Sequence, residues 1–248
     1  MSILEADNVT KKFGKLVAVD DVTIDVHDEI TALIGPNGAG KTTFFNVLSG
    51  MYKPTSGSIT FQGTDITGKP PNKIARRGLT RSFQITNLFD DLTVFENARI
   101  AVQRHYTNTF DMLSSADENP EVTQEVEQML KTIGLLDKGK LEATELSYGQ
   151  KRKLEIALSI GTEPEMLLMD EPTAGLALDN SNIVTELIVE LSEEYPILFV
   201  EHDMDIVFDI ADTILVMGNG QLIASGDPDD IKTNNRVKEV YLGEEQHA

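Results

Sequence analysis

The stretch Ile-Thr-Ala-Leu-Ile-Gly-Pro-Asn-Gly-Ala-Gly-Lys-Thr at residues 30–42 decides the fold of this chain. Apolar and β-branched residues at 30–34 predict a buried strand, and residues 41–49, followed by Gly50, predict a helix. The loop between them fits the pattern GxxxxGK(S/T), in which backbone N–H groups, a lysine and a helix N-terminus bind phosphate. Lys41 would supply a positive charge, and the Thr42 hydroxyl would ligate Mg²⁺. An ordinary glycine-rich turn is the alternative, and the flanking strand and helix argue against it.

The segments on both sides of this loop predict an α/β protein with a mostly parallel sheet. Residues 22–26 and 58–62 predict short strands, so the N-terminal third is rich in β-structure. Apolar strands at 166–169 and 197–200 alternate with helices, a pattern typical of parallel sheets. Segments on either side of Gly-Asn-Gly at 218–220 predict a hairpin near the end of the chain.

The middle of the chain predicts helices. Residues 93–96 form a capping box, and Asn119-Pro120 begins a second helix. The apolar stripe of that second helix consists of Val122, Val126, Met129, Leu130 and Ile133. We therefore expect a helical insert between two β-containing segments.

Two carboxylates follow the apolar run at 166–169. Their place at the carboxyl end of a buried strand is where α/β sheets bind ligands. Asp170 would hold Mg²⁺ through water, and Glu171 would polarise the attacking water as a general base. The alternative is a strand that ends in a surface Asp-Glu-Pro turn, and the phosphate loop elsewhere in the chain favours the catalytic interpretation.

Two further motifs allow more than one interpretation. His202 follows the apolar strand at 197–200, so it either contacts the γ-phosphate or is a structural histidine at a strand end. Residues 146–150, Leu-Ser-Tyr-Gly-Gln, contain the capping box Ser-x-x-Gln, which needs no ligand. The same helix start also directs N–H groups and a serine hydroxyl at solvent, as an anion site does. Composition alone leaves both alternatives open.

Composition limits the classes of function. The 248 residues carry a net charge of −20, which argues against a nucleic-acid-binding protein. The acidic balance fits either plain solubility or a salt-rich cytoplasm. No cysteine is present, which excludes disulfides and thiolate metal sites. No apolar stretch reaches the roughly 18–20 residues of a membrane helix, and the N-terminus lacks a signal peptide, so we expect no membrane span and a cytoplasmic protein.

Together these motifs resemble ABC ATPases over the whole chain. The Walker A loop matches residues 35–42, the signature 146–150, the Walker B strand 166–171 and the switch histidine His202, in family order and spacing. The resemblance implies ATP and Mg²⁺ as ligands, with Glu171, His202 and Gln84 as catalytic residues and Thr42, Gln84 and Asp170 at the metal. It implies nucleotide contacts at Phe13, whose ring would stack on adenine, and at Gly35, Pro36, Asn37, Gly38, Ala39, Gly40, Lys41, Thr42, Thr43, Ser147, Gly149 and Gln150.

Finer features resemble the ATP-binding subunits of branched-chain amino acid importers and, less distinctively, those of urea and amide importers. These features are the tyrosine in the signature, Arg-Ser-Phe-Gln at 81–84, Val-Glu-His-Asp-Met at 200–204 and Tyr-Leu-Gly-Glu at 241–244. Such systems use two related ATPases, and this chain is similar to the one with the longer helical insert.

The resemblance implies a P-loop nucleotide-binding core at residues 1–87 and 156–248, with an antiparallel β edge. A helical subdomain at 88–155 would end in the signature motif. Each signature would act on the ATP of a second ATPase subunit, in a homodimer or a heterodimer. Permease subunits would cross the membrane, and this chain would lie on its inner face. Ala177 departs from the family pattern, which usually has Asp or Asn there, so the usual contact between the two sites is in doubt.

Other classes of protein fit less well. Non-transport ABC ATPases of DNA repair insert long coiled coils and need basic surfaces. A GTPase would have Asp two residues after Lys73, where this chain has Ala75. A regulatory module that does not hydrolyse ATP would be expected to have lost Lys41 or Glu171, and both are present.

Overall fold

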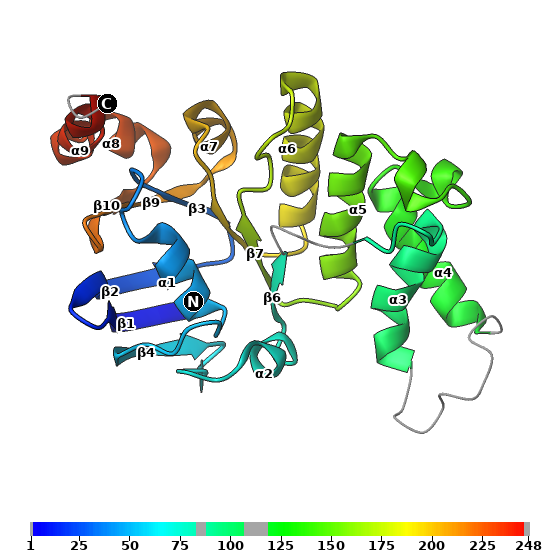
Figure 1. The fold of residues 1–248 in the computed structure, drawn as a ribbon, viewed down its shortest axis with the longest axis horizontal. Coiled ribbons are helices and arrows are strands. Elements are labelled where there is room, and N and C mark those ends of the chain that lie inside the picture. The colour runs from blue at the N-terminus through cyan, green and yellow to red at the C-terminus, as the bar shows by residue number, and fades with distance from the viewer. Residues whose placement is uncertain (1, 83–87, 107–118, 246–248) are drawn as a thin grey trace.

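The computed structural model describes residues 2–82, 88–106 and 119–245, and a six-stranded sheet forms its centre (Figure 1). The strand order is β10-β9-β3-β8-β7-β6, parallel throughout except for the antiparallel pair β9 and β10. The strands are β3 (Ile30–Ile34), β6 (Leu79–Ser82), β7 (Met166–Asp170), β8 (Ile197–Val200), β9 (Thr213–Gly218) and β10 (Gln221–Gly226). The mostly parallel sheet and the terminal hairpin predicted from the sequence are confirmed.

A four-stranded antiparallel sheet forms the edge of the molecule, in the order β2-β1-β4-β5. Its strands are β1 (Leu4–Phe13), β2 (Leu16–Val26), β4 (Ser56–Phe61) and β5 (Thr64–Asp65). Helix α1 (Lys41–Leu48) packs its buried face into the same apolar cluster as these strands. The antiparallel edge is therefore joined to the central sheet through the helix that follows the phosphate loop.

Helices occupy the chain between β6 and β7. The short helix α2 (Pro71–Ala75) precedes β6, and α3 (Val94–Tyr106), α4 (Pro120–Thr132) and α5 (Tyr148–Ile160) follow it, with 3₁₀ turns at Leu136–Lys138 and Ala143–Glu145. Figure 1 shows α3 and α4 side by side, on the far side of α5 from the antiparallel sheet. After β7 come α6 (Leu178–Ser192), α7 (Met204–Ile210), α8 (Pro228–Thr233) and α9 (Asn235–Glu245).

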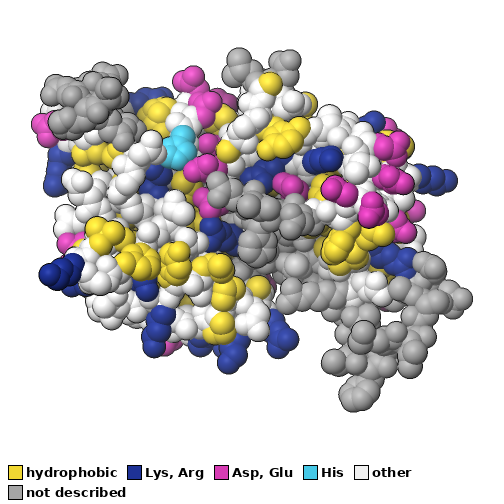
Figure 2. Space-filling view, viewed as in Figure 1, with side chains coloured by type: hydrophobic (Ala, Val, Ile, Leu, Met, Phe, Trp, Pro, Cys, Tyr) yellow, Lys and Arg dark blue, Asp and Glu magenta, His cyan; other side chains and the backbone are white. Residues whose placement is uncertain are grey.

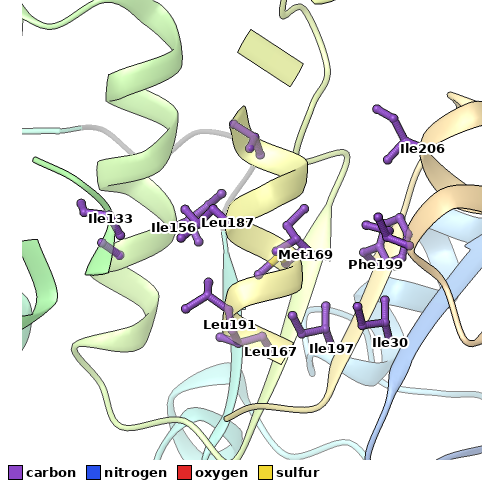
Figure 3. Close-up of a cluster of buried hydrophobic side chains, with 14 of the residues drawn as sticks. Ile30, Ile133, Ile156, Leu167, Met169, Leu187, Leu191, Ile197, Phe199 and Ile206 are labelled. Carbon is purple, nitrogen blue, oxygen red and sulfur yellow. The ribbon is translucent and has the colours of Figure 1, made fainter. Parts of the chain in front are cut away.

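The two faces of the central sheet bury different apolar clusters. Along β7, Leu167 and Met169 join the cluster shared with α5 and α6, whereas Leu168 joins the cluster shared with α1. Figure 3 shows the first cluster, in which Leu167, Met169 and Ile197 lie close to Leu187 and Leu191. Because successive side chains of a strand point to opposite faces, the four-residue apolar run at 166–169 is buried on both sides. The predicted stripe of α4 is buried too.

Candidate functional site

The phosphate loop runs from the end of β3 to the start of α1, and two of its glycines are required by close backbone contacts. A Cβ on Gly35 would lie 2.1 Å from the Met217 carbonyl oxygen, and one on Gly40 would lie 2.4 Å from that of Ala18. Gly40 also has φ +99° and caps α1 without any side chain. The N–H groups of the first turn of α1 therefore face the loop, which suits an anion.

Lys41 is buried under this loop, with only 5% of its surface exposed. Its ammonium donates to the Gly35 carbonyl and, over 3.0 Å, to the Pro36 carbonyl. Thr42 is exposed and Thr43 half-buried, and both line the same pocket as Lys41. The charge predicted to bind phosphate is thus held inside the loop by the loop's own carbonyl groups.

The carboxyl ends of β7 and β8 bring the predicted catalytic groups to the phosphate loop. Glu171 and His202 line one pocket together with residues 37–43. The His202 Nε2 and Glu171 Oε1 atoms are 3.0 Å apart. Since an ionised carboxylate only accepts, the imidazole donates from Nε2 in this contact. Geometry therefore joins three motifs that are separate in the chain, with 130 positions between Lys41 and Glu171.

Asp170 lies beside this pocket in an ion pair that the sequence did not indicate. Arg81 NH2 is 2.5 Å from Asp170 Oδ2, and the Asp170 side chain is only 4% exposed. The same guanidinium donates to Asn46 Oδ1 (2.6 Å) and Ser49 Oγ (3.1 Å), and its centre lies 5.0 Å from the centroid of the Phe45 ring. Arg81 thus links the Walker B carboxylate to the far end of α1.

The donor set fits Mg²⁺ bound with a nucleotide. Thr42 and Asp170 offer hard oxygen ligands, which Mg²⁺ prefers. Within the described residues, no group of three or more His, Cys, Asp or Glu side chains could hold a metal ion alone. Phosphate oxygens and water would complete the coordination. Gln84, the third predicted ligand, lies outside the described residues.

The signature residues lie at the N-terminus of α5, away from α1 (Figure 1). Ser147 Oγ accepts from the Gln150 N–H, and the Gln150 side chain accepts from the Ser147 N–H, so the predicted capping box is present. Because the serine oxygen accepts in this cap, its hydroxyl hydrogen is available to donate to an anion. A Cβ on the buried Gly149 would lie 2.7 Å from Asn180 Oδ1, at the start of α6. The capping and phosphate-binding interpretations are therefore compatible.

The structure does not bring every predicted contact into the pocket. Phe13 is 43% exposed, packs edge-on against Tyr52 with ring centroids 5.4 Å apart, and is absent from the residues that line the pocket. The wall beside the phosphate loop comes instead from residues 16–18 and from Asn219-Gly220. Sequence reasoning missed these residues, because a turn and a strand start carry no chemical motif. None of the helices among the described residues is long and apolar enough to span a membrane.

Comparisons with known proteins agree with this geometry. Residues 19–174 match the family described as ABC transporter, and residues 221–247 match one described as branched-chain amino acid ATP-binding cassette transporter. The chain is 41% identical over 250 residues to the high-affinity branched-chain amino acid transport ATP-binding protein LivG of Escherichia coli, covering 98% of both chains. It is 41% identical over 247 residues to the probable LivG protein of Archaeoglobus fulgidus, covering 98% of this chain and 96% of the other.

Solved structures are similar over almost the whole chain. A nucleotide-free ATP-binding cassette from an ABC transporter matches with a TM-score of 0.85 and 33% identity, covering 97% of this chain and 99% of that one. The ADP conformation of an ATP-binding cassette matches with a TM-score of 0.86 and 32% identity, covering 98% and 99%. With the phosphate loop, Glu171 and the switch histidine assembled at one pocket, this chain belongs to the ABC transporter family and is one of its ATPases.

Proposed function

We propose that this chain binds Mg-ATP at the interface of two ATPase subunits and drives the uptake of branched-chain amino acids through separate permease subunits. The observation that carries the ATPase site is the 3.0 Å contact of His202 with Glu171 at the phosphate loop. The solute is inferred from relatives named for branched-chain amino acid transport that align with nearly the whole chain. The match at residues 221–247 supports the same solute.

Each residue has a distinct part in the proposed reaction. The α1 N-terminus and Lys41 bind the phosphates, and Lys41 exchanges its carbonyl partners for phosphate oxygens. Glu171 accepts a hydrogen bond from the attacking water and takes its proton, while His202 fixes the carboxylate and contacts the γ-phosphate. Mg²⁺, when bound by Thr42 and Asp170, neutralises charge on the phosphate oxygens.

The second subunit is proposed because Ser147 and its capped helix lie apart from the chain's own phosphate loop. The signature of each subunit would close on the nucleotide of the other, in a homodimer or a heterodimer. We propose that residues 88–155 move as a helical subdomain relative to a core of residues 1–87 and 156–248. Different affinity for ATP and ADP then drives closing and opening, and this does work on a permease at the inner face of the membrane.

Two substitutions test the catalytic assignment. Glu171→Gln keeps the shape but removes the base, so ATP turnover should fall about 100-fold or more while ATP affinity changes little. Lys41→Ala should instead weaken ATP binding itself, because it removes the charge under the phosphates. Turnover and nucleotide titration of the purified variants separate the two effects. Wild-type turnover by Glu171→Gln would show that another group is the base.

A second experiment tests the solute. In cells that lack this chain, uptake of labelled leucine, isoleucine and valine should fall, and wild-type chain but not Glu171→Gln should restore it. Labelled urea and an unrelated sugar serve as controls whose uptake should not change. Loss of urea uptake with intact leucine uptake would assign the chain to the other importer class.

A further inference from the structure

The backbone of Glu171 has an unfavourable conformation. Its φ is +46°, in the left-handed region that side-chain-bearing residues rarely adopt. Its N–H donates to the Val200 carbonyl over 2.9 Å, so the ladder between β7 and β8 continues to this residue. The chain then turns sharply into Pro172. A carboxylate on such a turn keeps its direction only if the surrounding structure holds the peptide groups.

Arg152 holds the carbonyl side of this turn. Its guanidinium Nε donates to the Pro172 carbonyl over 2.8 Å, and NH2 lies 3.2 Å from the Glu171 carbonyl oxygen and 3.5 Å from that of Asp170. The residue is only 9% exposed. NH1 pairs with Glu155, at 3.1 Å, on the same helix. A single side chain of α5 thus contacts three successive carbonyl groups around the catalytic residue.

Glu201 holds the opposite side of the turn. Its Oε1 accepts from the Thr173 N–H over 2.9 Å and from the Thr173 hydroxyl over 2.5 Å, and its Oε2 accepts from the His202 N–H over 2.9 Å. Only 4% of Glu201 is exposed. This carboxylate therefore joins the residue two positions after Glu171 to the residue that contacts the Glu171 side chain.

A buried charge costs free energy unless it is fully hydrogen-bonded. The Arg152 guanidinium and the Glu201 carboxylate are both buried, and both make hydrogen bonds to the same turn. We propose that Arg152 and Glu201 are positioning residues that clamp the 171–173 turn from two sides and aim the Glu171 carboxylate at the attacking water. Neither side chain lines the phosphate pocket, so both act through Glu171 and His202.

The clamp also connects the signature helix to the catalytic turn of the same subunit. Ser147 caps the helix that carries Arg152, so a displacement of α5 moves the guanidinium against the Asp170, Glu171 and Pro172 carbonyls. The inference rests on the proposed role of Glu171 as the general base.

Kinetics of the full-length chain test the clamp. Arg152→Lys keeps the charge but loses the planar fork, and Glu201→Gln keeps one acceptor but presents an amide donor to one of its donor partners. Each should lower kcat about 10- to 100-fold, as expected when a reacting group is displaced by about 1 Å. ATP affinity should change less than about twofold, since no phosphate contact is lost. Wild-type kcat in both variants would overturn the proposal.

Two matched variants show which contact matters. Glu155→Gln removes the charged partner of Arg152 but leaves the three carbonyl contacts, so kcat should stay within about twofold of wild type. Thr173→Val removes one of the two bonds to Glu201 without changing shape, so it should lower kcat less than Glu201→Gln does. A larger loss of kcat in Glu155→Gln than in Arg152→Lys would mean that the ion pair, and not the clamp, is responsible.

A double-mutant cycle separates the clamp from the proposed base. If Arg152 acts through Glu171, then Arg152→Lys should lower the residual turnover of Glu171→Gln by less than about twofold. A full effect in that background would overturn the clamp while leaving the base intact. Conversely, wild-type turnover in Glu171→Gln alone would contradict the base, and the aiming role of the clamp would be lost with it.

Hydrogen exchange gives a readout that does not depend on turnover. In Glu201→Gln the amides of residues 173–176 should exchange faster than in wild type, while amides in β3 and α1 keep their protection. Arg152→Lys should have the same local effect. Unchanged exchange at 173–176 in both variants would show that the turn needs neither side chain.

Discussion

Phe13 presents an aromatic face to solvent next to the phosphate pocket, although it does not line that pocket. An exposed ring held edge-on by Tyr52 is ready to stack on a planar base. Phe13→Ala should therefore weaken ATP binding about 2- to 12-fold, because ring stacking contributes about 0.5–1.5 kcal/mol. Phe13→Tyr should keep wild-type affinity.

Titration of Phe13→Ala with ATP and with inorganic triphosphate checks this prediction, since only the affinity for ATP should fall. Equal affinity in Phe13→Ala would indicate that adenine rests on Leu16 and Val17.

We expect the stability of the chain to depend on pH through Glu155. Burial raises the pKa of this carboxyl above its ordinary value of 4.5, and the hydrogen bond and charge of Arg152 oppose the rise. A raised pKa in the folded state means that the contribution of Glu155 to stability is present at low pH and is lost as pH rises through that pKa. The melting temperature of Glu155→Gln relative to wild type should therefore increase between about pH 4 and pH 7. Glu186→Gln, an exposed change, is the control, and a difference independent of pH would contradict the prediction.

The residues of the site were predictable to different degrees. Short motifs with a characteristic spacing made three residues recognisable: Lys41, Asp170 and Glu171. No such motif contains Arg81, Arg152 or Glu201, because each of them contacts a residue at least 18 positions away. Arg81, for example, contacts Asp170 over 89 positions. No local pattern distinguishes such an arginine or glutamate from a surface charge. Only the packing of α5, β6 and β8 around the catalytic turn identifies them.

At the scale of elements, strands with an unbroken apolar pattern were predictable, and irregular strands were not. The runs at β3, β7 and β8 are buried on both faces and stand out in the sequence. Strand β1 is twice as long as any of these, but its pairing with β2 shifts register after Ala6, Val9 and Lys11, and Asn8 has φ +49°. Such irregularities interrupt the two-residue period by which a half-buried strand is recognised.

The loop before α3 fits a docking surface. Phe89 is 56% exposed, while Asn97 holds its backbone by accepting from the Phe89 N–H (2.9 Å) and donating to the Phe89 carbonyl (3.1 Å). Leu88 and Leu92 are half-buried, so a fixed loop presents one free phenyl ring. A further apolar residue nearby in the sequence, Ile85, lies outside the described residues. None of Leu88, Phe89 and Leu92 is fully buried, so we propose that this loop contacts the permease.

Phe89→Glu should weaken binding of the chain to the proposed permease, because a charge would replace apolar area at the proposed contact. ATP turnover by the purified chain should stay within about twofold, since Phe89 does not line the phosphate pocket. Leu136→Glu is a matched control, as Leu136 is 45% exposed on a different part of the helical segment. Co-purification with the permease measures the effect. Equal recovery of Phe89→Glu and wild type would place the docking surface elsewhere.

At the scale of the whole molecule, charge is distributed unevenly. Figure 2 shows Asp and Glu gathered on the side of α5, and Lys and Arg along the edge near α2, where Lys69, Lys73, Arg76 and Arg77 line one hollow. Exposed charges further apart than about 8 Å are largely screened at physiological salt. The net charge of −20 therefore does not prevent a polyphosphate from binding at α1, where backbone N–H groups and Lys41 act at close range.

The proposed mechanism depends most on a composite site, in which the signature of one subunit meets the phosphate loop of another. Lys41→Ala damages the phosphate loop and Ser147→Arg blocks the signature, so homodimers of either variant contain no intact site. Mixing the two gives heterodimers in which one interface joins an intact phosphate loop to an intact signature and the other carries both defects. Since about half of randomly paired dimers are of this kind, with one working site of two, turnover should return to about a quarter of wild type.

The mixing experiment has a control in its concentration dependence. If the natural partner is a second, related ATPase, homodimers are weak, and the two changes must be placed in different subunits of the assembled transporter. In either arrangement turnover per subunit should fall on dilution, because a monomer brings its phosphate loop to no signature. Constant turnover per subunit far below any measurable association would contradict the composite site. Ser147 would then serve only to cap the N-terminus of α5.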